Sequence, residues 1–467
     1  MFIGRNKEIQ KLQKIINSPK HEFGIIYGIR QVGKTALLTQ IQKQNPKKVI
    51  YFIADQTGLP NNLKTLTKRI TTFFKDPKYI FEDYYDLFEY FYKKANQKEI
   101  VLIIDEFSYL IQSDKSIMSI FQKIYEEIVS KSKIKIILSG SHLGIMESID
   151  SYLNPLYNRT TFKKIQLLPF DYKEASLFFS DLDAIDKIKF YSIFGGMPFV
   201  LKKINPKKDL KSNIKTIFLQ EKNNIEEVLI SLLGHENKKT SVYEPIFKIL
   251  SYGNNKTISY IANKLEQDIP KITNLLKTLT NMKLINKEIS FEEVSKKPKK
   301  TNYSFADPFF KFYYFFIKKN ESESIIMNEN KFYELFILPQ LEKFISLEFE
   351  KICQTFLFKK YYQNEKIKKI GRYWANNTKE NIHCEIDIIL TDTENKTTIF
   401  ECKWSNSKID FKIVKQLQQK KEHLKKLNFF LNTDIQLGFF SKNGFDDKLI
   451  QNNNYLLFIP DDLYNLS

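Results

Sequence analysis

Eight residues near the start of the chain, 28–35, have the spacing of a phosphate-binding loop. They read Gly-Ile-Arg-Gln-Val-Gly-Lys-Thr and lie between an apolar run typical of a buried strand and a helical pattern. Backbone N–H groups at such a junction point at phosphate oxygens, and the helix dipole favours the anion. Lys34 is predicted to reach the β- and γ-phosphates, and the Thr35 hydroxyl to bind Mg²⁺. The predicted nucleotide-binding residues of this segment are Gly28, Arg30, Gly33, Lys34, Thr35 and Ala36.

A second pattern places two acids at the end of a strand. Residues 100–104 form an apolar run that is followed by Asp105 and Glu106. Such a run predicts a buried parallel strand that delivers carboxylates to its C-terminal edge. Asp105 is predicted to hold Mg²⁺, and Glu106 to polarise the attacking water. Two acids after a strand are common, but together with the phosphate loop they indicate hydrolysis of ATP or GTP.

Further strand-like runs predict the sheet that positions these groups. They alternate with helical stretches, which is typical of a parallel α/β sheet with its ligand at the carboxyl ends of the strands. Ser139 or Ser141 then lies where a sensor of the γ-phosphate is expected, and a plain strand-ending turn is the alternative. The further runs cover residues 24–27, 49–53, 134–138 and 161–167.

Composition narrows the class of protein. The chain has 467 residues, 42% hydrophobic and 14% aromatic, which predicts a globular protein of about two to four domains. No apolar run approaches the length of a membrane span, and the first residues lack the pattern of a signal peptide. Cys353, Cys384 and Cys402 have no disulfide or metal spacing. We therefore expect a cytoplasmic protein with no membrane partner.

The net charge of +19 points to an anionic partner such as nucleic acid. Most of the 73 basic residues are lysine, a bias that also fits mutational drift in an AT-rich genome. Arginine is rare enough that each one is informative, because its planar guanidinium recognises phosphates and carboxylates in a way lysine does not. The arginines are Arg5, Arg30, Arg69, Arg159 and Arg372.

The chain resembles the archaeal-type ATPases, a branch of the AAA+/STAND class of P-loop ATPases. The resemblance implies that Gly4 and Arg5 lie near the adenine or the phosphates, and that Pro198 belongs to a helical lid over the base. Besides the two patterns above, it rests on Phe2-Ile3-Gly4-Arg5-x-x-Glu8, Leu138-Ser139-Gly140-Ser141, Pro155-Leu156-Tyr157-x-Arg159, Leu168-Pro169-Phe170 and Gly195-Gly196-Met197-Pro198.

Arg159 has two readings. In this class an arginine after the sensor strand can act as a finger on the γ-phosphate. The alternative is a structural arginine that pairs a surface carboxylate. Whether a finger would act on its own nucleotide or on a neighbour's stays open, so a homo-oligomeric ring and a monomer are both compatible with the sequence.

Residues 238–305 predict a winged helix. Helical segments at 242–250, 257–265 and 268–279 precede a hairpin whose tip, residues 296–300, is rich in lysine. The third helix would offer polar side chains to a DNA groove, and the wing would contact phosphates. A lid or a protein-docking element is the alternative. The predicted DNA-contacting residues of the helix are Lys271, Thr273, Asn274 and Lys277.

The C-terminal part contains a predicted hairpin with acids on both strands. If the turn centres near Glu394, Asp387 faces Glu401 and Glu385 faces Lys403. Alternation along the strands then places all four side chains on one face. Two carboxylates and a lysine suit a Mg²⁺ site that hydrolyses a phosphodiester, with Lys403 orienting the nucleophile. The opposite face is predicted to pack through Cys384, Ile386, Ile388, Phe400 and Cys402.

This arrangement is similar to the PD-(D/E)xK nuclease fold, although Ile386 replaces the proline of that motif. The similarity implies a metal site of Glu350, Asp387 and Glu401, with Glu350 supplied by the preceding helix. Gln416 or Gln418 on the following helix is predicted to assist.

The sequence thus predicts an α/β protein: a P-loop ATPase core (1–165), a helical lid (166–237), a winged helix (238–305), an aromatic connector (306–339) and a restriction-endonuclease-like α/β domain (340–467). The predicted function is a Mg²⁺-dependent ATPase that binds DNA and cleaves it through the C-terminal site. A nucleotide-gated switch or scaffold with a non-catalytic C-terminal domain is the alternative. A third reading is an ATPase that grips protein or RNA.

Overall fold

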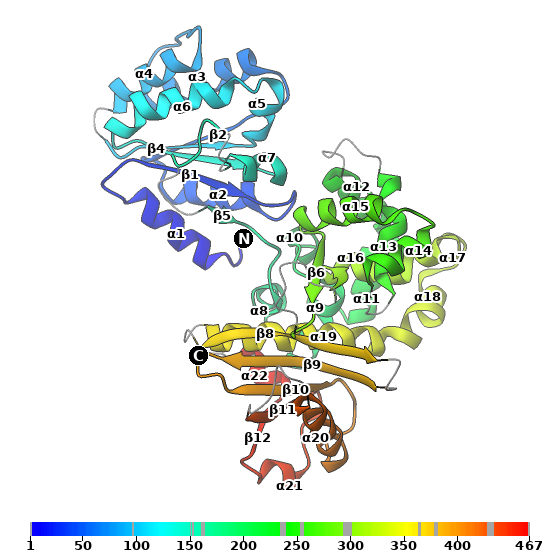
Figure 1. Cartoon of the computed structure of the whole chain (residues 1–467). Coiled ribbons are helices and arrows are strands. Elements are labelled where there is room, and N and C mark those ends of the chain that lie inside the picture. Colours follow the sequence, from blue (N-terminus) through cyan, green and yellow to red (C-terminus); the bar gives the residue numbers. More distant parts are fainter. Residues whose placement is uncertain are drawn as a thin grey trace. The chain divides into compact units, whose positions relative to one another are not determined.

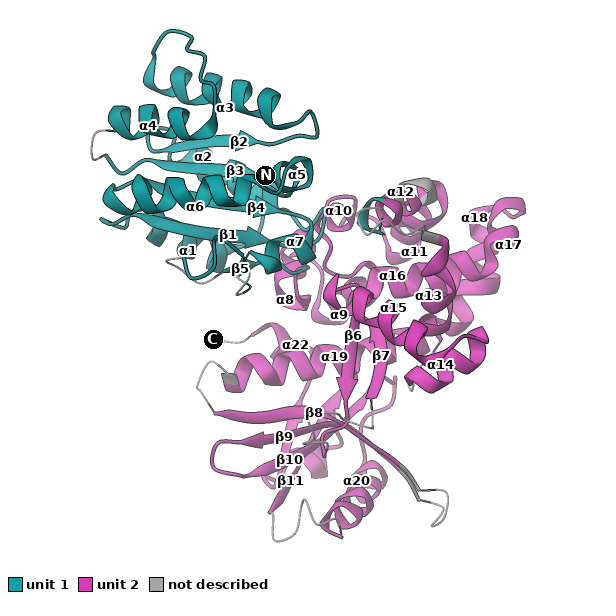
Figure 2. Ribbon diagram, turned by 45° about the horizontal axis from the view of Figure 1, so that its top comes forward, with its two compact units in different colours: residues 1–169, 231–237 teal, residues 170–230, 238–467 magenta. Residues whose placement is uncertain are grey.

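The computed structural model describes residues 2–95, 98–149, 151, 154–159, 164–233, 240–252, 256–292, 301–362, 366–377, 382–426 and 434–465. These residues form two compact units, which are described separately (Figure 2). The first comprises residues 1–169 and 231–237, and the second comprises residues 170–230 and 238–467.

The first unit is built on a five-stranded parallel sheet with the strand order β2-β3-β4-β1-β5. The predicted parallel α/β sheet is therefore confirmed. Residues 160–163, at the start of the last predicted run, lie outside the described residues. The strands are β1 (Glu22–Tyr27), β2 (Val49–Ile53), β3 (Val101–Asp105), β4 (Lys135–Gly140) and β5 (Ile165–Gln166).

Helices cover both faces of this sheet (Figure 1). On one face α3 (Leu59–Phe74), α4 (Tyr84–Ala95), α5 (Ser108–Ser113) and α6 (Ile117–Glu127) bury a large aliphatic and aromatic core against the strands. The helices α1 (Asn6–Ile16) and α2 (Lys34–Gln44) lie on the other face. A short helix, α7 (Leu143–Ser148), follows β4.

The second unit begins with short helices and contains the three predicted helices of the winged-helix region. Thr257 caps the second of these by accepting a hydrogen bond from the Tyr260 N–H, whereas the Asp268 side chain makes no cap bond to the third. In the parts of the chain that the structure describes, no helix combines the length and apolarity needed to cross a bilayer. The helices are α8 (Tyr172–Ala175), α9 (Ala184–Phe194), α10 (Pro198–Leu201), α11 (Leu210–Ile214), α12 (Lys222–Leu233, of which residues 231–233 belong to the first unit), α13 (Glu244–Ser251), α14 (Ile258–Leu265) and α15 (Ile269–Asn281).

The hairpin predicted after α15 is present as two antiparallel strands, β6 (Ile285–Ile289) and β7 (Thr301–Phe305). Its lysine-rich tip falls within residues 293–300, outside the described residues. The aromatic stretch that follows includes α16 (Pro308–Phe312) and is almost entirely buried.

Asp307 ties this stretch to the Gly195-Gly196 motif. Its carboxylate accepts the Gly196 N–H at 2.9 Å and the Phe309 N–H at 2.9 Å. A Cβ on Gly196 would lie 1.8 Å from the Phe170 carbonyl oxygen, and one on Gly195, at φ 64°, would lie 1.9 Å from Asp307. Both glycines are therefore required by close packing.

The C-terminal part is a second five-stranded sheet, of mixed direction and with the order β12-β11-β10-β9-β8. The helices α19 (Leu338–Tyr362) and α20 (Phe411–Lys425) lie on opposite sides of it (Figure 2). The strands are β8 (Ile367–Asn377), β9 (Ile382–Asp392), β10 (Thr397–Lys403), β11 (Ile435–Ser441) and β12 (Tyr455–Phe458), and the remaining helices are α17 (Glu321–Ile326), α18 (Glu329–Phe332), α21 (Asp447–Ile450) and α22 (Pro460–Tyr464).

The predicted hairpin register is observed, because Phe400 pairs with Ile388 and Ile399 with Ile389. The predicted division of faces is wrong. β9 pairs with β8 through Ile389 and then Ile386, so one extra β9 residue opposes β8 between these pairs. Such a bulge reverses the alternation of side chains. Cys384 and Ile386 consequently share the α20-side core with Ile389, and do not join Phe400.

A buried ion pair inside the second unit offers a test of the packing. Lys311 and Glu348 are 4% and 2% exposed and lie 2.6 Å apart. Lys311→Met is expected to lower the free energy of unfolding by about 3–5 kcal/mol, because it leaves a buried carboxylate without its main cation. Lys311→Met/Glu348→Leu should recover most of that loss in urea unfolding.

The matched control is Lys211→Met, which breaks the half-exposed pair with Glu334 and should cost about 0–1 kcal/mol. Equal losses for Lys311→Met and Lys211→Met would contradict a structural role for the buried pair.

Candidate nucleotide site and C-terminal acidic cluster

The predicted phosphate loop connects β1 to α2. Gln31 and Gly33 have positive φ angles of 61° and 97°, which turn the backbone into the loop before the helix begins at Lys34. The Lys34 ammonium donates to the carbonyl oxygens of Gly28 at 2.8 Å and Ile29 at 3.1 Å. Burial lowers the pKa of Lys34, and the nearby Glu106 and Asp105 oppose that shift. The lysine therefore lies folded over the loop that a phosphate chain would enter.

Asp105 is fully buried at the carboxyl end of β3 and joins three elements. Its Oδ2 accepts the Thr35 hydroxyl at 2.8 Å and the Tyr51 hydroxyl at 2.7 Å. Its Oδ1 accepts the Glu106 N–H at 3.0 Å. Thr35 and Asp105, each predicted to bind Mg²⁺, are thus in direct contact.

These donors fit a magnesium ion. Hydroxyl and carboxylate oxygens are the hard ligands that Mg²⁺ prefers. Here the Thr35 hydroxyl at the start of α2 contacts the Asp105 carboxylate at the end of β3, next to the phosphate loop. Thr35 and Asp105 would hold the ion, which would neutralise phosphate charge when bound. Tyr51 would keep the Asp105 carboxylate in place.

Glu106 is held by the end of β4. Its backbone adopts a left-handed conformation, φ 54°, which is uncommon for a residue with a side chain. The carboxylate accepts the Ser141 hydroxyl at 2.7 Å and the Ser141 N–H at 3.3 Å. Ser139 is fully buried within β4, so Ser141 is the better placed of the two predicted sensor residues.

Of the other predicted nucleotide-binding residues, Arg5 lies behind the loop. It is 4% exposed and donates to the carbonyl oxygens of Val32 at 2.9 Å and Leu168 at 2.7 Å. Arg30 donates to the hydroxyl groups of Tyr109 and Ser231. Pro198 begins α10 in the other unit, so its contact with the base stays a prediction, as does that of Gly4.

Arg159 pairs with a carboxylate, which was the structural alternative to a role as an arginine finger. Its guanidinium pairs with Glu126 at 2.6 Å and donates to the Tyr157 carbonyl oxygen at 2.7 Å. Tyr125, the residue before Glu126, packs its ring against that of Phe23 near the start of β1, with the centroids 5.5 Å apart. Arg159 therefore lies toward the amino end of β1, whereas the phosphate loop follows its carboxyl end. A finger acting on the chain's own nucleotide does not fit this geometry.

The sequence comparisons agree with the first site. Residues 2–204 match a family described as an ATPase domain predominantly from Archaea. The chain contains an archaeal-type P-loop ATPase domain. Residues 313–421 match a family of archaeal and bacterial proteins of unknown function. The resemblance inferred from the motifs is thereby confirmed for the ATPase domain, whereas the comparisons do not bear on the winged helix or the nuclease.

The matches to relatives and solved structures extend over most of the chain. An uncharacterized protein of Methanocaldococcus jannaschii is 29% identical over 87% of this chain and 88% of its own length. A Walker-type ATPase of Pyrococcus abyssi has a TM-score of 0.49 at 19% identity, covering 67% of this chain and 96% of that one. The ORC2 protein of Aeropyrum pernix has a TM-score of 0.42 at 14% identity, covering 74% and 94%.

In the second unit, the acids predicted as a metal site are divided between the two faces of the sheet. Glu401 accepts Lys403 at 2.6 Å and Lys420 of α20 at 2.7 Å. Glu350 on α19 lies 3.9 Å from Arg372, which also donates to Glu385. Asp387 accepts the Cys402 N–H at 2.8 Å. The expectation that Glu385, Asp387, Glu401 and Lys403 share one face is therefore not met.

The charges of these acids follow from their surroundings. Burial and the neighbouring Glu401 raise the pKa of Asp387 to about 6. Burial and Asp387 raise the pKa of Glu350 to about 8. Burial also acts to raise the pKa of Glu401, but Lys420 and Lys403 outweigh it and hold that pKa below its usual value.

As arranged, these carboxylates do not fit a divalent cation. Glu401 is occupied by two lysines and Glu350 is near an arginine. Among the described residues, no three acidic, histidine or cysteine side chains converge closely enough to hold a metal ion. Gln416 and Gln418, predicted to assist, are exposed, and Lys420 of the same helix donates to Glu401.

Tyr51 and Lys420 were not predicted. Tyr51 is the single residue with a polar side-chain group in the run 49–53, on the strand next to β3. That lone hydroxyl in an apolar run could have indicated a contact with Asp105. Lys420 is one of many lysines on α20, so its type carried no information.

The Glu106 geometry generates a prediction for catalysis. Glu106→Gln should lower steady-state phosphate release from ATP by about 10²- to 10⁴-fold, because it removes the proposed base. ATP binding measured by calorimetry should persist, since Lys34 and Thr35 are untouched. The control is Glu99→Gln, two residues before the start of the same strand and paired with Lys48. A Glu106→Gln enzyme with wild-type turnover would contradict the assignment.

The raised pKa values generate a prediction for stability. Asp387 and Glu350 bind protons more tightly in the folded chain than in the unfolded chain, where carboxyls titrate near pH 4. Their stabilising contribution is therefore complete below about pH 4 and is lost as pH rises through about 6 and then 8. The slope is up to about 1.4 kcal/mol per pH unit for each proton released.

Urea unfolding between about pH 5 and 8.5 should show a steeper fall for the wild type than for Asp387→Asn/Glu350→Gln. Asp392→Asn/Glu394→Gln, which changes the half-buried last residue of β9 and an exposed residue of the turn after it, should retain the wild-type slope. Parallel curves for the wild type and Asp387→Asn/Glu350→Gln would show that burial does not shift these acids.

Proposed function

We propose that this P-loop ATPase hydrolyses Mg²⁺-bound ATP and binds DNA through the region of α13–α15. The observation that carries the first half is the contact of Thr35 with Asp105 directly behind a complete phosphate loop, with Glu106 one residue further on. Lys34 would leave the loop carbonyls to bind the β- and γ-phosphates, and Glu106 would take a proton from the attacking water.

The exposed face of α15 supports DNA binding. Lys271, Thr273, Asn274 and Lys277 are all exposed, while Ile272, Leu275, Leu276 and Leu279 are buried. The helix therefore presents to solvent the polar side chains that the sequence predicted as DNA contacts. Lysine contacts of this kind bind phosphates with little sequence discrimination.

The hairpin after α15 is anchored, which limits its role as a wing. Phe291, just after β6, is 1% exposed and is part of the core of the C-terminal sheet. Its N–H donates to the Arg372 carbonyl oxygen of β8 at 2.8 Å. We therefore assign DNA contact to α15, with the hairpin joining it to the C-terminal domain.

For the C-terminal domain the geometry favours a binding surface over a nuclease. The order of α19, β8, β9, β10, α20 and β11 supports the similarity to the nuclease fold. The pairing of the acids with Lys403, Lys420 and Arg372 supports the alternative in which no metal is held. Mn²⁺-dependent DNA cleavage by the wild type, lost in Asp387→Asn, would favour the nuclease.

The DNA proposal predicts a change in salt dependence. Lys271→Gln/Lys277→Gln should weaken binding to duplex DNA and lower the slope of log K against log salt by about 1 for each lost phosphate contact. Fluorescence anisotropy with labelled DNA at several salt concentrations measures both quantities. The control is Lys207→Gln/Lys208→Gln, which removes two other exposed lysines of the same unit. Identical slopes for all three proteins would contradict the proposal.

A further inference from the structure

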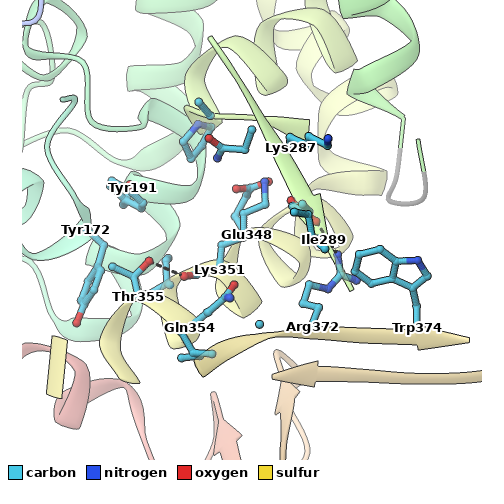
Figure 3. Close-up of a pocket in the computed structure, with 17 residues that line it drawn as sticks. Tyr172, Tyr191, Lys287, Ile289, Glu348, Lys351, Gln354, Thr355, Arg372 and Trp374 are labelled. Atoms are coloured by element: carbon cyan, nitrogen blue, oxygen red, sulfur yellow. Dashed lines mark hydrogen bonds and ion pairs between the residues drawn. The ribbon is translucent and has the colours of Figure 1, made fainter. Parts of the chain in front are cut away.

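A polar cavity of about 380 Å³ lies within the second unit, between β6, α19 and β8. The nucleotide site and the proposed DNA-binding helix do not use it. Figure 3 shows Arg372 and Trp374 side by side on β8, beneath Ile289 of β6, with Glu348 and Lys351 on the facing turn of α19. Cavities of this size hold small organic ligands.

Arg372 has unused hydrogen-bonding capacity at this cavity. Its side chain is 11% exposed, and a guanidinium carries five N–H donors. Among the described residues it donates one hydrogen bond, to Glu385, while Glu288 and Glu350 lie at 3.6 and 3.9 Å, beyond hydrogen-bond distance. Its Nε is buried without a partner. Buried donors of this kind are costly unless an acceptor fills the space beside them.

The charges of the lining favour an anionic acceptor. Lys287, Lys351 and Arg372 face two acids, Glu288 and Glu348. Glu348 pairs with Lys311, which is not part of the lining, at 2.6 Å, and with Lys351 at 3.4 Å. The Ser304 hydroxyl donates a hydrogen bond to the Glu288 carboxylate at 2.5 Å and so stabilises it. Counted over the lining side chains alone, three cations face two acids, and outside the lining Arg372 also donates to Glu385.

The remaining lining groups suit a planar heterocycle. Trp374 offers an indole face, and bases stack on such faces whatever their sequence. Asn286 and Gln354 supply amide groups that can hydrogen-bond the edge of a base, and the Thr355 hydroxyl, which donates to the Lys351 carbonyl oxygen, can still accept. A planar guanidinium beside the indole matches the planar, bidentate geometry of a phosphate.

We propose that this cavity binds a phosphate-bearing nucleotide, with the phosphate on Arg372 and the base on Trp374. The nucleotide is either free or the terminal residue of a nucleic acid strand, since both present the same chemistry. Because Glu288 of β6 also faces Arg372, a phosphate bound there competes with that ion pair. Occupancy of the cavity is thereby linked to the hairpin that leads from α15.

Trp374 itself reports on the site. The chain has two tryptophans, so Trp404→Phe leaves Trp374 as the sole indole, and Lys34→Ala removes nucleotide binding at the phosphate loop. In that double variant, the emission of Trp374 is titrated with AMP, adenosine, inorganic phosphate and a 5′-phosphorylated oligodeoxythymidylate. A saturable change with AMP, weakened about tenfold or more for adenosine, is the expected result. Comparing the affinity for AMP with the affinity for the oligonucleotide shows whether the ligand is a free nucleotide or the end of a strand.

Adding Arg372→Gln should weaken AMP binding about tenfold or more, while Arg69→Gln, an exposed arginine of the other unit, should leave it unchanged. If circular dichroism shows that Arg372→Gln does not fold, the partly exposed Lys351 at the rim of the cavity provides the test. Lys351→Gln should weaken the binding of AMP but not that of adenosine. No saturable change with any probe up to about 1 mM, or equal affinities for AMP and adenosine, would overturn the proposal.

Discussion

The buried carboxylate of Asp105 is the interaction on which the nucleotide site depends. It stands at the end of β3, accepts hydroxyl groups from β2 and from the first turn of α2, and accepts the N–H of Glu106. An unpaired carboxylate in that position would be costly, so its three donors fix the end of the strand against the start of the helix. The phosphate loop and the proposed base are positioned by the same contact.

The second unit solves a different electrostatic problem. Its acids lie on both sides of the C-terminal sheet, with Glu350 on α19 beside Arg372 and Glu401 on β10 paired with Lys403 and with Lys420 of α20. In the described part of the chain, Asp105 accepts only neutral donors beside the phosphate loop, whereas Glu401 is paired with two lysines. This contrast is why we propose a metal ion at Asp105 and a binding surface, not a nuclease, in the C-terminal domain.

Short sequence patterns predicted the elements whose formation depends on neighbouring residues in the chain. The phosphate loop, the runs that became β1 to β4, and the three helices around α15 depend on spacing and periodicity within about a dozen residues. The bulge in β9 could not be predicted, because one inserted residue leaves the hydrophobic pattern intact while reversing the faces. Phe291 with Arg372, and Arg159 with Glu126, are partners distant in sequence that no periodicity specifies.

Electron paramagnetic resonance of Mn²⁺ tests the central claim most directly, because Mn²⁺ can replace Mg²⁺ at oxygen ligands. We predict that the chain binds one tight Mn²⁺ when a non-hydrolysable ATP analogue is present, and that Thr35→Val abolishes this signal. The C-terminal acids should add no second tight ion. Mn²⁺ bound equally with and without nucleotide, or retained in Thr35→Val, would contradict the account.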